Sequence, residues 1–124
     1  MNQYTREIHA QDGVVHLRLK GRYPNEHLRQ EQNVFTALID ACEQNHCQNA
    51  VIDARDLEVD FNTLEYFRAG VDASELHRYG LRLALVAREE MISSFFDDVI
   101  HNRGVAVRVF TDLESASTWV RKNG

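Results

Sequence analysis

The sequence predicts an α/β fold: an N-terminal β-hairpin, then alternating helices and strands, giving a mainly parallel five-stranded sheet flanked by about four helices. One observation behind this prediction is an alternating polar and apolar pattern interrupted by Asp12-Gly13. Another is a series of short apolar runs separated by segments with helical periodicity. The chain has a single proline and no Gly/Ser-rich linker, so we expect residues 1–124 to form one domain.

The hairpin is predicted from the alternation between Tyr4 and Lys20. An Asp-Gly pair flanked by alternating apolar residues is the strongest short-range hairpin signal. The side chains expected on the core-facing side are those of Tyr4, Ile8, Ala10, Val15, Leu17 and Leu19.

Interior strands are predicted where short apolar runs occur: "NAVIDA" (49–54), "LRLALVA" (81–87) and "VAVRVF" (105–110). Helices are predicted between and after them. The first has Asn25 as its N-cap and an apolar stripe that includes Leu38 and Cys42, and further helices cover 62–78 and 89–101. Thr111 and Glu114 are expected to open a last helix that ends near Arg121.

Composition narrows the class of protein. The chain carries 14 basic and 19 acidic residues, a net charge of −5, so nucleic acid is not expected as a partner. No run approaches the roughly 18–20 apolar residues of a membrane span, and "MNQYTREIHAQDG" lacks the apolar centre of a signal peptide. We therefore expect a cytoplasmic protein whose two cysteines stay reduced.

Acidic residues crowd the exit of the strand predicted at 49–54. Asp53 lies near its end, and Asp56, Glu58 and Asp60 are expected in the loop that follows. Ligands of open α/β sheets bind at the carboxyl ends of strands, but aspartates also favour turns and helix starts. Three interpretations stay open: turn and cap chemistry, a protein-contact loop, and catalysis. Catalysis is the weakest, because Arg55 is the only basic residue of the loop and no nucleophile accompanies it.

Cys42, His46 and Cys47 form a C-x3-H-C pattern near the end of the first helix. Cys42 and His46 would share a helix face, a spacing that can bind zinc. Cys42 also continues the apolar stripe, which favours a core role. Two or three ligands without a second cluster are a weak signal for a metal, so we expect none. No phosphate-loop or dinucleotide motif is present, so we expect no nucleotide cofactor and no other cofactor.

The segment "MISSFFDDVIHNRG" (91–104) carries a wider apolar surface than a helix resting on one sheet face requires. The surplus is consistent with packing on a neighbouring helix, with a surface that joins a partner or a second copy, or with an apolar pocket. The candidate pocket residues are Phe67, Met91, Phe95 and Phe96.

The tail "GLRLALVARE…FFDDVIHNRGVAVRVFTDLESASTWV" and the segment "VIDARDLEVD" resemble the SpoIIAA-like branch of the STAS superfamily. The resemblance covers nearly all of residues 14–120 and implies a regulatory protein that is not an enzyme. In the anti-sigma factor antagonist type, a kinase phosphorylates a serine in a "DSSG"-like stretch. The resemblance places that Asp at Asp60 and that serine at Phe61, which has no hydroxyl, followed by Asn62 and Thr63.

These observations lead to one favoured hypothesis and one alternative. The favoured hypothesis is a non-enzymatic regulatory module that binds a protein partner. Two interpretations of Thr63 stay open: it only stiffens the first turn of the helix, which is favoured, or it is a phosphosite. The partner-binding loop of this module comprises Asp56, Glu58, Asp60, Phe61, Asn62 and Thr63. The alternative is a carrier of a small apolar ligand or lipid, to which a similarity to CRAL-TRIO-type folds also points. A homodimer is left open.

Overall fold

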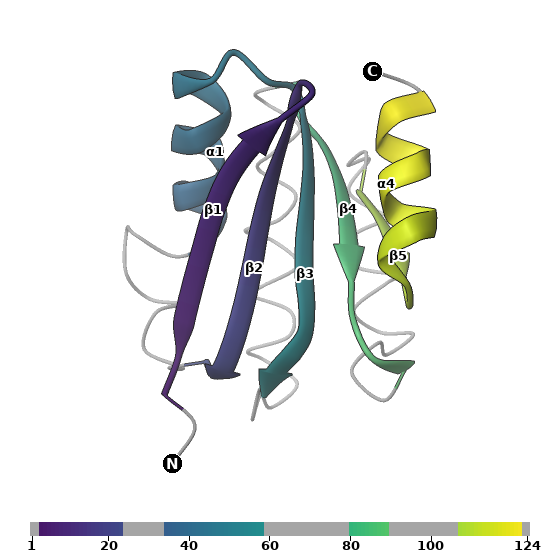
Figure 1. Ribbon diagram of the computed structural model, residues 1–124. Coiled ribbons are helices and arrows are strands. Elements are labelled where there is room, and N and C mark those ends of the chain that lie inside the picture. The colour runs from purple at the N-terminus through teal and green to yellow at the C-terminus, as the bar shows by residue number, and fades with distance from the viewer. Residues whose placement is uncertain (1–2, 24–33, 59–79, 90–106, 123–124) are drawn as a thin grey trace.

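The computed structural model describes residues 3–23, 34–58, 80–89 and 107–122. In chain order its elements are β1 (Thr5–Gln11), β2 (Val14–Arg22), α1 (Val34–Gln44), β3 (Asn49–Glu58), β4 (Arg82–Val86), β5 (Val107–Phe110) and α4 (Leu113–Lys122). Figure 1 shows the strands side by side, with both helices packed on the sheet. No helix among the described residues is long and apolar enough to cross a membrane.

The five strands form one sheet in the order β1-β2-β3-β4-β5. We expected a mainly parallel sheet; the observed sheet is mixed, since β1 pairs antiparallel with β2 and the other pairings are parallel. The five strands and the opening hairpin are confirmed. The described residues contain two helices rather than about four, and the helices predicted at 62–78 and 89–101 lie outside them, apart from Glu89.

The hairpin turn is built by Asp12 and Gly13, whose φ angles are 54° and 76°. Positive φ at both central residues defines a type I′ turn, whose twist matches that of the flanking strands. The turn brings Gln11 opposite Val14 and fixes a regular register back to Thr5 and Lys20.

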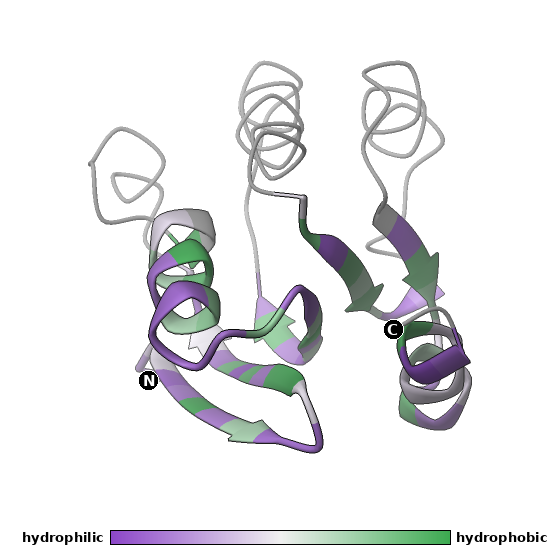
Figure 2. Ribbon diagram, turned by 90° about the horizontal axis from the view of Figure 1, so that it is seen from above, coloured by the Kyte–Doolittle hydropathy of each residue, from purple (hydrophilic) through white to green (hydrophobic). Residues whose placement is uncertain are grey.

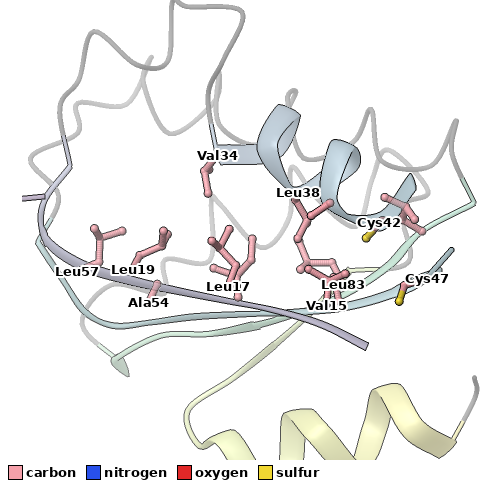
Figure 3. Packing of buried hydrophobic residues seen from close by; sticks show 14 of the residues in the cluster. Val15, Leu17, Leu19, Val34, Leu38, Cys42, Cys47, Ala54, Leu57 and Leu83 are labelled. Carbon is pink, nitrogen blue, oxygen red and sulfur yellow. The ribbon is translucent and has the colours of Figure 1, made fainter. Parts of the chain in front are cut away.

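The two helices cover opposite faces of the sheet (Figure 2). The face under α1 holds the larger cluster of buried residues, in which Leu38 of the helix points toward Val15 and Leu83 of the strands (Figure 3). The face under α4 holds a smaller cluster that includes Val51, Ala84, Val86, Ala116 and Val120. Because strand side chains alternate between faces, neighbouring residues of β3 serve the two clusters in turn.

Ile8 departs from the expected core. It shares a sheet face with its partner Leu17, as predicted, but 43% of its surface is exposed, whereas Leu17 is 1% exposed. The reason is position, because α1 packs over β2 and β3 and leaves the edge strand β1 uncovered.

Two element boundaries also differ from the prediction. Strand β3 extends to Glu58 rather than ending near residue 54. Helix α4 begins at Leu113, and the residue that caps it is Asp112 rather than Thr111, since the Asp112 Oδ2 accepts a 2.8 Å hydrogen bond from the Ser115 N–H.

Candidate functional site

The candidate site is the carboxyl end of β3, where the strand changes from buried apolar residues to charged ones. Its pairing with β2 shifts at this point: Asp53 lies opposite Arg18, but Asp56 lies opposite Lys20. One extra residue in β3 therefore forms a bulge. Bulges bend a strand and redirect its side chains, and they are frequent beside functional sites.

Asp53 is the buried charged residue of this site, with 9% of its surface exposed. Its Oδ1 accepts hydrogen bonds from Arg55 Nε at 2.9 Å and from the Arg55 N–H at 3.2 Å, and its Oδ2 accepts one from Arg55 Nη2 at 2.8 Å. Burial by itself raises the pKa of Asp53. The hydrogen bonds and charge of Arg55, with the charge of Arg18, outweigh that effect and hold the pKa below its ordinary value of 3.8.

Asp56 takes part in a second ion pair on the same face of the sheet. Arg18 Nη2 donates to Asp56 Oδ2 at 3.0 Å, and both side chains are about half exposed to solvent. Exposed pairs of this kind contribute about 0–1 kcal/mol to stability. The pair orients the Asp56 carboxylate more than it stabilises the fold.

Charged groups continue toward the start of α4. The hydrogen bond from the Ser115 N–H lowers the pKa of Asp112, and the positive charge of Arg55 lowers it further. The hydrogen bonds and the charge of Asp53 raise the pKa of the Arg55 guanidinium, and the charges of Asp56 and Asp112 raise it further.

The end of β3 is held on both sides through its main chain. The Tyr23 N–H donates to the Glu58 carbonyl at 2.9 Å, and Arg88 Nη2 donates to the Leu57 carbonyl at 3.0 Å. Leu57 is also buried in the cluster beneath α1. These contacts fix the position from which the chain leaves the sheet after residue 58.

The chemistry of this arrangement favours recognition over proton transfer. A catalytic acid or base at neutral pH needs a pKa near 7, whereas Asp53 is ionised and bound by Arg55. The described end of β3 presents acidic groups whose orientation is fixed by arginines, which suits contact with a polar or basic surface.

The structure places the predicted site residues as follows. Asp56 and Glu58 lie within β3, so the prediction that they belong to a loop is wrong; the bulge and the Tyr23 hydrogen bond keep that segment in the ladder. The remaining predicted loop and pocket residues lie outside the described part of the chain, and their roles stay predictions: Asp60, Phe61, Asn62, Thr63, Phe67, Met91, Phe95 and Phe96.

Sequence reasoning did not identify Arg18 and Asp112 as members of the site. Arg18 reaches Asp56 because parallel pairing of β2 and β3 brings their ends together. The pairing of Asp53 with Arg55 could have been predicted from their spacing, because side chains two residues apart on a strand lie on the same face.

The C-x3-H-C pattern lies at the other end of β3. Helix α1 ends at Gln44, and His46 takes a left-handed conformation with φ 54°, so Cys42 and His46 do not share a helix face as expected. The Cys47 N–H bonds to the Cys42 carbonyl and the His46 N–H to the Glu43 carbonyl, which is a Schellman C-cap.

Both cysteines belong to the core, as the favoured interpretation predicted. They are 2% and 8% exposed, and burial, with the neighbouring Cys47, raises the pKa of Cys42 to about 11. An open groove of about 620 Å³ passes over this C-cap and is lined by residues that include Gly13, Ile39, His46 and Leu81. In the described ranges, no three His, Cys, Asp or Glu side chains are grouped so that they could hold a metal ion.

A family model described as "Domain of unknown function (DUF4180)" matches residues 18–120. The chain belongs to this family. No match was found among curated proteins.

Two solved structures share the fold of this DUF4180 chain. An anti-sigma factor antagonist from Mycobacterium paratuberculosis aligns with a TM-score of 0.62 and 18% identity, over 96% of this chain and 95% of that one. An uncharacterized DUF3478 protein with a SpoIIAA-like fold, from Shewanella loihica PV-4, aligns with a TM-score of 0.57 and 14% identity, over 97% of this chain and 95% of that one. The fold is therefore SpoIIAA-like, as the sequence resemblance predicted.

Proposed function

We propose that this chain is a non-enzymatic regulatory module that binds a protein partner through the end of β3 and the segment that follows it. Asp56 and Glu58 form the described part of this surface, and Asp60, Phe61, Asn62 and Thr63 continue it along the chain. The observation that carries the proposal is the likeness to an anti-sigma factor antagonist over nearly the whole of both chains.

The geometry at the end of β3 supports the same proposal. Arg18 holds the Asp56 carboxylate at an exposed position, and the main-chain bonds to Leu57 and Glu58 anchor the strand end. Preorganised charged groups mainly supply specificity and association rate at protein interfaces. A partner with a complementary basic patch fits this surface.

Regulation at this surface would differ from the serine switch of the relatives it resembles. Phe61 occupies the position of the phosphorylated serine and has no hydroxyl group. Thr63 is the hydroxyl-bearing residue nearest to that position, and a phosphate there would add about 1.5–2 negative charges beside Asp60. We expect such a charge to strengthen the attraction of this surface for a basic patch on a partner and to weaken binding to a partner whose contact surface is acidic.

The test is affinity capture followed by measurement of binding to the purified partner. The double variant Asp56→Asn/Glu58→Gln removes two charges from the proposed surface with little change in size. The matched control Asp40→Asn/Glu43→Gln removes two exposed charges from α1 instead. We expect the first variant to weaken binding by about tenfold or more and the control to leave it unchanged.

Equal affinity for all three proteins would contradict the proposal. So would a purified chain that turns over a metabolite and loses that activity in Asp53→Asn while still folded.

A further inference from the structure

Strand β1 is a regular edge of the sheet formed by the described strands. It pairs with β2 on one side, and along all seven of its residues the register is free of shifts. Every residue of β1 is exposed except Arg6, which is partly buried. Natural proteins usually protect edge strands by shortness, charged side chains, proline or bulges. Strand β1 is seven residues long and has no proline, lysine or bulge, and its charged residues are one of each sign, Arg6 and Glu7.

The register determines which main-chain groups of β1 point outward. In the two-residue type I′ hairpin, Gln11 and Val14 form a hydrogen-bonded pair, and such pairs alternate with non-bonded ones along an antiparallel ladder. The main-chain N–H and C=O groups that point to β2 are therefore those of Thr5, Glu7, His9 and Gln11. The N–H and C=O groups that point to the outer edge of the described sheet are those of Arg6, Ile8 and Ala10.

The side chains of β1 are complementary to a second copy of the same strand. In an antiparallel pair centred on Ile8, each Ile8 lies opposite the other, Arg6 lies opposite Ala10, and Glu7 lies opposite His9. Ile8 is one of the two large apolar residues exposed in the described chain, and it lies at the centre of the strand. The acidic Glu7 meets an imidazole rather than another carboxylate, so no like charges face each other.

The neighbouring groups favour this arrangement. His9 stacks on His16 of β2, with ring centroids 4.9 Å apart and an interplanar angle of 9°, so its ring is already oriented on the sheet face. Arg6 lies over the Tyr4 ring at 5.5 Å, which draws its long side chain back along its own strand. The small Ala10 side chain then leaves room for Arg6 of the second copy.

We propose that two copies of this chain associate through β1, with the strands antiparallel about Ile8, to form one continuous sheet across the dimer. The outward N–H and C=O groups of Arg6, Ile8 and Ala10 supply the main-chain hydrogen bonds of the interface. The proposal does not depend on the partner-binding surface at the end of β3.

The first test is sedimentation velocity combined with NMR-detected amide exchange, at protein concentrations from about 10 µM to about 1 mM, the range suited to a small interface. We expect a reversible dimer, and amides of Ile8 and Ala10 that exchange more slowly as the dimer forms. The amides of Glu7 and His9 bond to β2 in the monomer and serve as internal controls, with little dependence on concentration.

The second test uses variants of β1. Ala10→Pro removes an outward N–H, which an edge strand tolerates, and by symmetry deletes a donor from each copy. We expect dimerisation about tenfold or more weaker, whereas Ala10→Ser keeps the N–H and the small side chain and should retain the dimer. Ile8→Glu puts two carboxylates opposite each other and should also abolish association, which keeps the test decisive if the proline variant folds poorly.

A wild-type chain that stays monomeric up to about 1 mM would overturn the proposal. A dimer that Ile8→Glu and Ala10→Pro leave intact would overturn it equally, because association would then use another surface.

Discussion

At the scale of single residues, the decisive pair is Asp53 and Arg55. The carboxylate is 12% exposed and accepts two guanidinium hydrogen bonds, while the arginine is 41% exposed. The ionised form of Asp53 is thus stabilised by a partner that is partly screened by water. Removing Arg55 leaves a nearly buried carboxylate whose charge solvent compensates only in part.

We predict that Arg55→Gln lowers the free energy of unfolding by about 1–2 kcal/mol near neutral pH, less than for a fully buried pair because Arg55 is well exposed. The folded-state pKa of Asp53 lies below 3.8, so its stabilising effect is present above 3.8 and is lost as pH falls through the lower folded-state value. The difference between wild type and variant should therefore shrink below that pH. Urea unfolding over this pH range measures it.

Arg18→Gln is the matched control, because it removes a guanidinium from the exposed pair with Asp56. It should change stability by less than about 1 kcal/mol. An Arg55→Gln effect as small as this one, or one that persists unchanged in acid, would contradict the role assigned to Asp53.

These residues show what sequence alone could predict. Asp53 was placed at a strand end from the apolar run before it, and the Asp53-x-Arg55 spacing was visible. The Arg18–Asp56 pair spans 38 positions and depends on the register of two parallel strands, which no local pattern specifies. Burial of Cys42 was predicted correctly from its place on an apolar stripe.

At the scale of elements, local chemistry accounts for the hairpin but not for the length of β3. A type I′ turn needs positive φ at both central residues, and the Asp12-Gly13 pair is a residue combination that adopts it readily. The continuation of β3 past Ala54 depends on the bulge opposite β2 and on the Tyr23 hydrogen bond to Glu58. Those contacts are tertiary, so the charged sequence "RDLE" was interpreted as a loop.

Two glycines of β2 and its turn provide a test of these elements. Both have positive φ, but a Cβ at Gly13 meets nothing within 4 Å, whereas one at Gly21 would clash with the Gln3 carbonyl group. We predict that Gly13→Ala costs about 1–2 kcal/mol from backbone conformation alone, and that Gly21→Ala costs at least about 3 kcal/mol. Chemical denaturation of both variants gives the comparison.

The larger loss of stability in Gly21→Ala should be accompanied by displacement of residues 3–4 away from Gly21. Tyr4 packs edge-on against Tyr23, with ring centroids 5.1 Å apart, so the tyrosine environment should change in Gly21→Ala and not in Gly13→Ala. Equal losses from the two variants would show that the close approach of Gln3 to Gly21 has no energetic importance.

At the scale of the whole molecule, α1 and α4 cover opposite faces of a five-stranded sheet, and the chain shares its SpoIIAA-like fold with an anti-sigma factor antagonist. The order of strands and helices was predictable because hydrophobic periodicity changes clearly along the sequence. The solvent exposure of the Ile8 side chain on β1 could not be predicted in this way, because it depends on which strands α1 covers.

In the proposed function, the end of β3 and the segment after it form the partner-binding surface. Hydrogen exchange of the chain, alone and in complex with its captured partner at one protein concentration, tests it most directly. We expect slower exchange on binding at residues 56–63, with no change in α1. Protection confined to α1, or exchange at 56–63 that is unaltered by the partner, would contradict it.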